Sequence, residues 1–155
     1  MSLFPTTGRL AGIDYGEKRV GISVCDPDRI LTSPLENYTR RGKEVDGPYL
    51  SKLLAEERVK GLVVGLPVFA SGEESPSSQA ARQFGKWLGE ITGLPIIYYD
   101  ERYTSSEAER LLGDARMTSK QKKARRDMLA AQILLSAYLE NPARAERPPE
   151  GLDDK

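Results

Sequence analysis

The stretch "GIDYGEKRVGISVCD", residues 12–26, places Asp14 in a run that otherwise reads as a buried strand. It belongs to two apolar segments, "RLAGIDY" and "VGISVCD", which are separated by a short turn containing Gly16. This pattern predicts a β-hairpin. Burying an ionised carboxylate is costly, so Asp14 needs a reason to stand there. One reason is a ligand crevice at the carboxyl end of the strand; the other is an ordinary turn aspartate that caps Gly16.

Alternating apolar strands and amphipathic helices follow the hairpin. The stretch "ILTSPLENY" predicts a third strand, and Pro34 favours an edge position for it. A helix is expected after a break at Gly47-Pro48. The later segments are a strand at 61–67, a helix at 77–91, a strand at 96–101, a short helix at 105–113 and a long amphipathic helix ending at 140. The order predicts an α/β fold whose mixed sheet is covered by helices on both faces.

The composition bounds the class of protein. A chain of 155 residues is expected to form one domain, residues 1–140, and the Pro-rich stretch 141–155 is expected to be a disordered tail. The 23 basic and 23 acidic residues balance, so net charge indicates no particular partner. No signal-peptide pattern or long apolar run is present, which favours a cytoplasmic protein without a membrane partner.

The absence of histidine narrows the possible chemistry. It excludes Ser-His-Asp and Cys-His nucleophiles and histidine-ligated zinc within this chain. The single cysteine, Cys25, is expected to pack as a small apolar side chain. Carboxylates must therefore carry any acid-base or metal chemistry.

Two further positions hold unusual carboxylates. Asp100 and Glu101 end a predicted strand, so their side chains should point to opposite faces, and only one can join Asp14. Thr104 with Glu107 has the spacing of a helix capping box, which is a purely structural alternative for that segment.

Asp127 is the most informative acid. Thr118 and Gln121 predict a helix start well upstream, so Asp127 falls inside the helix on the stripe continued by Ala131 and Leu134. Pairing with Arg125 or Arg126 would explain it structurally. A divalent cation is the alternative, and oxygen-only ligands suit Mg²⁺ or Mn²⁺.

Four segments in this order resemble one known family. They are "IDYGEKRVGISVCD", "VVGLPVFASG", "YYDERYTSSEAERLL" and "RRDMLAAQILLSAYL". Together they resemble the YqgF proteins, also called RuvX, a bacterial branch of the ribonuclease H-like nucleases that includes Holliday-junction resolvases. The resemblance runs from about Arg9 to Glu140. It implies a five-stranded mixed sheet with an antiparallel second strand.

The resemblance also implies site residues and a reaction. Asp14, Glu101 and Asp127 match the family's acidic residues, which implies that they hold Mg²⁺ or Mn²⁺ for phosphodiester hydrolysis. The residues expected to meet the substrate are Lys18, Arg19, Arg102, Thr104, Lys123 and Arg126. The chain departs from common family residues at Phe69, Ala70, Ser71 and Ser136, and Ala130 stands where related resolvases carry a fourth acid.

Between Arg116 and Arg126 lie six basic residues and no acidic one. This run could follow a phosphate backbone, or it could be a solvated helix face. Aromatic residues could stack on bases, but on strands they more often belong to the core, so none is assigned to binding. These aromatic residues are Phe69, Tyr98, Tyr99 and Tyr103.

The expected substrate is nucleic acid. The family implies processing of the 5′ end of the 16S ribosomal RNA precursor, with cleavage of four-way DNA as the alternative. A non-catalytic RNA-binding module is the third possibility, although such a module gains little from acids that repel phosphate. Asp-x-Gly before a hairpin also resembles the first phosphate loop of actin-like ATPases and sugar kinases, but the chain is too short for their two lobes and has no second such loop. No Walker A motif occurs either, which disfavours nucleotide binding. Either a monomer or a homodimer is compatible with the sequence.

Overall fold

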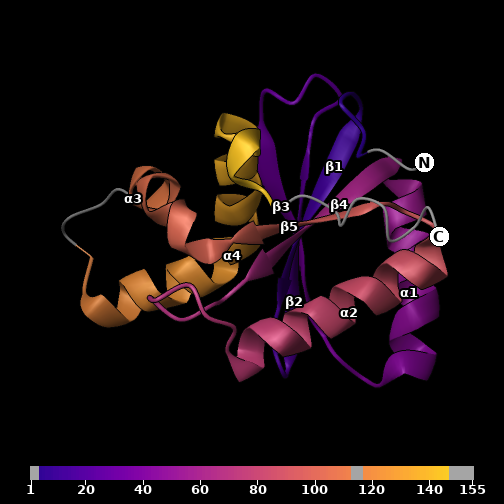
Figure 1. Cartoon of the computed structure of the whole chain (residues 1–155), viewed down its shortest axis with the longest axis horizontal. Coiled ribbons are helices and arrows are strands. Elements are labelled where there is room, and N and C mark those ends of the chain that lie inside the picture. Colours follow the sequence, from indigo (N-terminus) through magenta and orange to yellow (C-terminus); the bar gives the residue numbers. More distant parts are fainter. Residues whose placement is uncertain (1–3, 113–116, 147–155) are drawn as a thin grey trace.

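The structure, a computed structural model, describes residues 4–112 and 117–146, except for the side chains at positions 112, 123, 124, 127 and 128. Its strands are β1 (Arg9–Tyr15), β2 (Arg19–Cys25), β3 (Thr32–Thr39), β4 (Val59–Leu66) and β5 (Ile96–Asp100). Its helices are α1 (Lys43–Glu56), α2 (Pro76–Thr92), α3 (Ser105–Leu112) and α4 (Ser119–Glu140), with short 3₁₀ turns η1 (Glu101–Thr104) and η2 (Pro142–Arg144). Figure 1 shows their arrangement around the sheet.

The five strands lie in the order β3-β2-β1-β4-β5. β2 is antiparallel to both β1 and β3, whereas β4 is parallel to β1 and β5 is parallel to β4. The mixed sheet and its antiparallel second strand are therefore confirmed. Pro34 lies on β3, the edge strand, where the β2–β3 register shifts, as expected of a residue that cannot donate to a central ladder.

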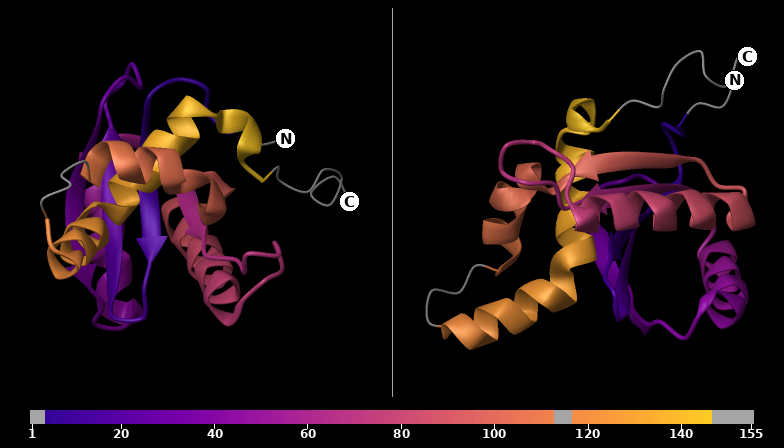
Figure 2. Two further views of the ribbon diagram at one scale, coloured as in Figure 1. Left: turned by 90° about the vertical axis from the view of Figure 1, so that its left-hand side faces the viewer. Right: turned by 60° about the horizontal axis from the view of Figure 1, so that its bottom comes forward.

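Alternation along the strands divides the core between the two faces of the sheet. Ala11 and Ile13 pack on the face covered by α1 and α2, together with Leu54 and Leu88. Leu10 points the other way, toward α4. Figure 2 shows these helices on opposite sides of the sheet. Because side chains alternate with a period of two, Asp14 must share the α4 face with Leu10.

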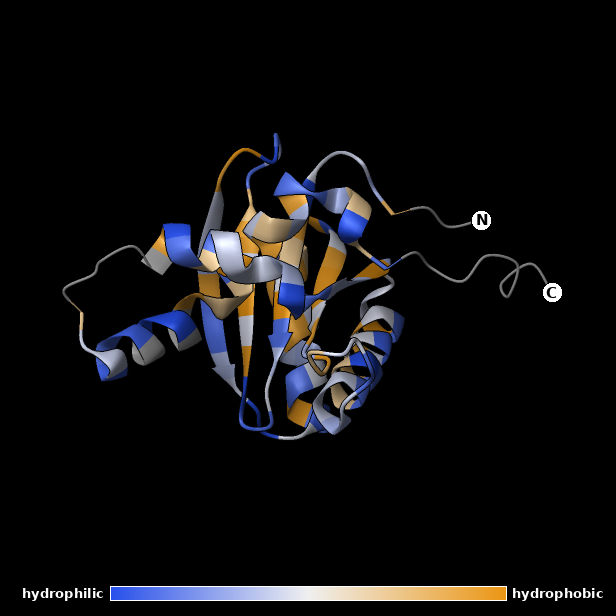
Figure 3. Cartoon of the chain, turned by 60° about the vertical axis from the view of Figure 1, so that its left-hand side comes forward, coloured by the Kyte–Doolittle hydropathy of each residue, from blue (hydrophilic) through white to orange (hydrophobic). Residues whose placement is uncertain are grey.

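Helix α4 begins where its capping residues predict. Thr118 Oγ1 accepts from the Gln121 backbone N–H at 3.1 Å, and Gln121 Oε1 accepts from the Thr118 N–H at 2.9 Å. The first half of α4 projects beyond the sheet and is strongly hydrophilic in Figure 3, whereas its second half lies on the sheet. Among the described helices, none combines the length and apolar character that a membrane crossing requires.

Helix α1 differs from the prediction, because it runs through Gly47-Pro48 without a break. Its first turn is held by tertiary contacts: the buried Asp46 carboxylate accepts from the Tyr38 hydroxyl at 2.6 Å and from the Arg41 N–H at 2.9 Å. Gly47 packs against Trp87: a Cβ added at Gly47 would lie 3.5 Å from the Trp87 ring. These contacts offset the local preference of proline to end a helix.

The segment after α4 also differs from the prediction for 141–155. Residues 141–146 are ordered against the sheet: the Glu146 N–H donates to the Tyr98 carbonyl at 2.8 Å. The Arg82 guanidinium reaches the Glu146 carboxylate at 2.6 Å. These polar contacts, together with Ala145 packed against the core on the α4 face, hold the segment in place. Its composition gave no sign of order, because the contacts are made with distant elements. The rest of the expected tail, 147–155, lies outside the described residues.

Candidate active site

The end of β1 places Asp14 on the α4 face of the sheet. Its neighbour across the hairpin is Gly21, where an added Cβ would lie 3.6 Å from the Asp14 Cβ. On the other side, β1 pairs with β4 up to Ile13 and Val64. The next residue of β4 is Gly65. Asp14 is therefore flanked by glycines on both neighbouring strands, which leaves its carboxylate room on this face.

Glu101 reaches the same space from β5. It follows Asp100 at the end of the strand and shares the α4 face with Tyr99, as alternation predicts. A Cβ at Gly65 would stand only 2.5 Å from Glu101 Oε2. Gly65 thus leaves open the passage across β4 through which the Glu101 carboxylate approaches Asp14. Its place in "VVGLP" is the one sequence signal for this role, and the sequence interpretation did not use it.

A pocket of about 420 Å³ opens around the two acids. Its floor is the pair Asp14 and Glu101, and its walls come from η1, α3 and α4. The wall residues are Thr104, Ser105, Ala108, Glu109, Arg126, Ala130, Ile133 and Leu134. The pocket lies at the carboxyl ends of β1 and β5, the edge where open α/β sheets hold their ligands.

The two carboxylates interact directly. Burial, the negative charge of Asp14 and a hydrogen bond to Asp14 together raise the pKa of Glu101 to about 8, and burial is the largest of these causes. Near neutral pH, without a cation, the pair therefore retains a proton. A divalent cation would take the place of this proton, because it supplies the positive charge that the crowded oxygens lack.

The raised pKa predicts how stability depends on pH. The folded Glu101 has a pKa of about 8 against the ordinary 4.5, so between these values the folded chain binds more protons than the unfolded chain. The stability contributed by this group is complete below pH 4.5 and is lost as the pH rises to about 8. With a chelator present, wild type should therefore lose stability relative to Glu101→Gln as the pH rises over this interval. The difference between their free energies of unfolding should change by up to ~1.4 kcal/mol per pH unit.

Urea unfolding of both proteins across the pH range measures this difference. A constant difference between the two proteins would show that Glu101 is ionised in the folded state throughout.

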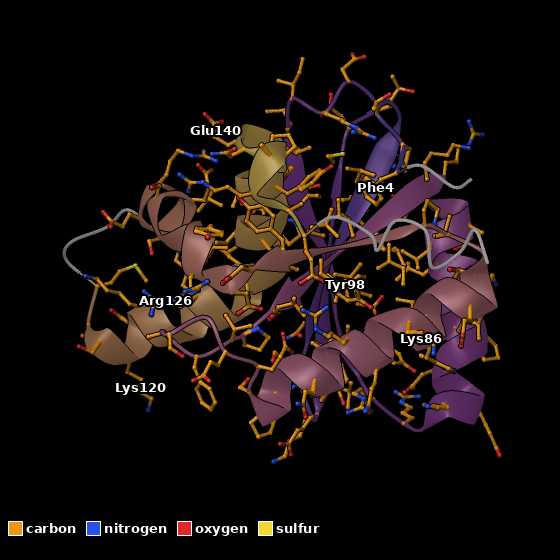
Figure 4. The ribbon with its side chains drawn as sticks, in the orientation of Figure 1. Phe4, Lys86, Tyr98, Lys120, Arg126 and Glu140 are labelled. Carbon is orange, nitrogen blue, oxygen red and sulfur yellow. The ribbon has the colours of Figure 1, made fainter. Side chains whose placement is uncertain are left out.

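The other predicted site residues are divided among several places. Thr104 and Arg126 line the pocket, and Thr104 donates to the Glu101 carbonyl at 2.7 Å. Lys18 is exposed in the turn that follows the strand carrying Asp14, and Arg19 is exposed at the first position of β2. Figure 4 shows Arg126 on the projecting part of α4.

Arg102 is directed elsewhere. Its Nη2 lies 2.6 Å from Asp100 Oδ2, and its Nη1 donates to the Ala70 carbonyl at 3.1 Å. Arg102 therefore ties the segment after β4 to the end of β5, outside the pocket of Asp14 and Glu101. The predicted contact of Arg102 with substrate stays a prediction, and such a contact would lie outside the pocket of Asp14 and Glu101.

The backbones of Lys123 and Asp127 lie in α4, but their side chains are outside the described set. The helix places Asp127 between Arg126 and Ala130, both of which line the pocket. Among the described side chains, no group of three or more potential metal ligands occurs, and Asp127 is not in that set. Glu109, which sequence reasoning missed, also faces the pocket; its spacing from Ser105 and Ala108 on α3 was the available signal.

Comparison with known proteins shows which sequences this chain resembles. A sequence model of the RuvX family, described as "Holliday junction resolvase", matches residues 8–141. A protein of Rhodopirellula baltica named "Putative pre-16S rRNA nuclease" is 46% identical over 137 residues, covering 88% of this chain and 79% of that protein. A protein of Koribacter versatilis with the same name is 37% identical over 133 residues, covering 86% and 87%.

Solved structures extend the likeness to the fold. RuvC of Thermus thermophilus, solved with a Holliday junction substrate, aligns with a TM-score of 0.57 and 14% identity over 90% of this chain and 98% of that one. A second structure of Thermus thermophilus RuvC gives a TM-score of 0.52 at 16% identity, covering 89% and 98%. Because the family model matches residues 8–141 and both named relatives are more than 35% identical to this chain, the chain belongs to the RuvX family.

Proposed function

We propose that this chain is a divalent-metal-dependent nuclease that hydrolyses phosphodiester bonds. The observation that carries the proposal is the pairing of Asp14 and Glu101, which lie far apart in sequence, face one pocket and retain a proton between them. Such a pair is destabilising without a cation and gives no evident benefit to the core. Membership of the RuvX family supports the same class of reaction.

The donor set fits Mg²⁺ or Mn²⁺, because only carboxylate oxygens and no histidine or free surface thiol are offered. We assign Asp14, Glu101 and Asp127 as the residues that would hold the ion. The bound ion supplies Lewis acidity and lowers the pKa of water for attack on phosphorus. The carboxylates orient the ion, and the apolar wall formed by Ile133 and Leu134 limits access of bulk water.

Basic side chains around the pocket are suited to hold the phosphate backbone. Arg126 lines the pocket and has no ion-pair partner among the described residues. Next to Arg126 in the sequence is the exposed basic run on the projecting half of α4. We propose that this run, including Lys123, contacts the phosphate backbone. Lys18 and Arg19 would approach from the β1–β2 turn, and the Thr104 hydroxyl from η1. The positive charges of these lysine and arginine side chains offset the repulsion between phosphate and the acidic floor.

We propose the precursor of 16S ribosomal RNA as the substrate, which the names of the relatives from Rhodopirellula baltica and Koribacter versatilis support. Four-way DNA is the second candidate, supported by the description of the matching family. A junction with two symmetric strands calls for a twofold homodimer, whereas RNA trimming needs only a monomer.

The test offers both substrates with Mg²⁺ or Mn²⁺: an RNA spanning the 5′ end of the 16S precursor, and a four-way DNA junction. Wild type is compared with Asp14→Asn, Glu101→Gln and Asp127→Asn. The matched control is Glu107→Gln, which removes an acid on α3 that pairs with Arg110 instead of facing the pocket. We expect the wild type and the control to cleave the RNA and the three site variants to fail.

Each result discriminates between the candidates. Cleavage of the junction alone would replace the RNA assignment with resolvase activity. Binding of RNA without cleavage would indicate a non-catalytic module. Equal cleavage by the wild type and all three site variants would overturn the assignment of the acids.

A further inference from the structure

The short turn η1 separates the active-site pocket from a second hollow of about 200 Å³. Glu101 and Thr104 face the first pocket, whereas Tyr103 lines the second. Arg144, from the segment after α4, lines the second hollow as well. The two cavities are thus neighbours on either side of a single turn of chain.

Tyr103 presents an aromatic ring to solvent at this place. Its side chain is 41% exposed, although its ring also packs edge-on against the buried Tyr99, with 6.3 Å between ring centres. The chain kinks at Tyr103, where φ is −93° and ψ is 15°, in the sparsely populated bridge region. An anchored but half-open ring of this kind offers a rigid surface for stacking.

Arg144 adds a cation beside this ring. Its guanidinium carbon lies 5.0 Å from the Tyr103 ring centre. Arg82, the other arginine that lines the hollow, is paired with Glu74 and Glu146, which line it too. Arg102, whose guanidinium carbon lies 5.8 Å from the Tyr103 ring centre, is paired with Asp100. Among the residues that the structure describes, no acidic side chain lies within ion-pair distance of Arg144. Arg144 is therefore the cation of this hollow whose charge is available to a ligand.

We propose that Tyr103 and Arg144 bind an unpaired nucleotide of the same strand that is cut in the neighbouring pocket. The base stacks on the exposed part of the Tyr103 ring, and the adjoining phosphate meets Arg144. This inference rests on the proposed nuclease function and adds a substrate class to it. Because the neighbouring base pairs cover both faces of a base inside a continuous duplex, such a base cannot stack on this ring. The chain should therefore prefer single-stranded nucleic acid next to the cleaved bond over a continuous duplex.

Fluorescence tests the stacking directly. The chain has one tryptophan, Trp87, which is half-buried against Phe84 on α2, so Tyr103→Trp introduces a second reporter at the hollow. In chelator, where nothing is cut, a single-stranded RNA of about 10 nucleotides should quench the Tyr103→Trp emission. A duplex of the same sequence should not quench it, and wild-type emission should stay constant with either probe.

The contributions of Tyr103 and Arg144 to affinity are measured by comparing the binding of variants with that of wild type. Tyr103→Leu should weaken single-strand affinity by about 5- to 150-fold, whereas Tyr103→Phe should bind as wild type does. Arg144→Gln should weaken binding and reduce the slope of log affinity against log salt by about one. If Tyr103 has only a structural role, Tyr103→Leu should have a lower thermal stability but the same ratio of single-strand to duplex affinity as wild type.

The outcomes separate this inference from the proposed function. Quenching with no cleavage of any substrate would sustain the nucleotide site and reject the nuclease. Cleavage by wild type, with single-strand binding but no quenching of Tyr103→Trp, would reject the nucleotide site and sustain the nuclease. Failure of wild type to bind the single strand, or equal losses on single strand and duplex, would also overturn the nucleotide site.

Discussion

Replacing Glu101 with Gln should lower the rate of metal-dependent cleavage by at least ~100-fold while leaving the chain folded. Loss of groups that merely support metal ligands costs about 10- to 100-fold, so loss of a proposed ligand should cost at least as much. Gln keeps the shape of Glu101 and can still hydrogen-bond to Asp14, but it cannot carry the negative charge that a cation needs. Single-turnover cleavage at saturating Mn²⁺ measures the effect.

The same substitution should leave metal-free stability equal or higher, because it removes a buried group that ionises beside another carboxylate. Loss of activity with retained stability is the pattern of a residue kept for function rather than for packing. Glu107→Gln is the matched control and should keep wild-type cleavage. If Glu101→Gln cleaves at the wild-type rate, then Glu101 holds no ion during the reaction.

Replacing Gly12 with Ala should destabilise the fold by about 3 kcal/mol, a large effect for one methyl group. An added Cβ would lie 2.6 Å from Ser23 Oγ, 2.7 Å from the Ala131 carbonyl oxygen and 3.0 Å from the Leu135 Cβ. The Ser23 hydroxyl already donates a 2.6 Å hydrogen bond to the Ala131 carbonyl, and this bond fixes α4 on the sheet. Either α4 moves away or the strand bends, and each response distorts the pocket that lies between Asp14 on β1 and the wall residues of α4.

Gly21→Ala provides the comparison for Gly12→Ala, since Gly21 is on the neighbouring strand and faces the same helix. Its Cβ would meet the Ala131 Cβ at 3.5 Å, an ordinary van der Waals contact. Urea unfolding midpoints should therefore fall much further for Gly12→Ala than for Gly21→Ala. Equal losses would show that α4 approaches β1 less closely than the structure indicates.

Local pattern predicted the parts of the fold that depend on local rules. Alternation along a strand separated Asp100 from Glu101, and the capping residues Thr118 and Gln121 located the start of α4. Both follow from the geometry of neighbouring residues alone, so the sequence is sufficient to predict them.

The errors arose where distant contacts override local preference. Asp46 is held by Tyr38 from another element, which keeps α1 intact through Pro48. Glu146 is ordered by Arg82 on α2. No periodicity records such pairings, because they depend on how elements meet in space. The requirement for glycine at position 65 is likewise a tertiary one, because it follows from the close approach of the Glu101 carboxylate.

Calorimetric titration of the metal-free protein with Mn²⁺ near pH 7, in buffers of different ionisation enthalpy, tests the central claim that Asp14 and Glu101 converge on a cation. Saturable binding should release about one proton per ion, since the pKa of Glu101 stands at about 8 before the metal enters. Glu101→Gln should bind more weakly and release none from this group. Binding that releases no proton in wild type, or that is unchanged in Glu101→Gln, would contradict the account.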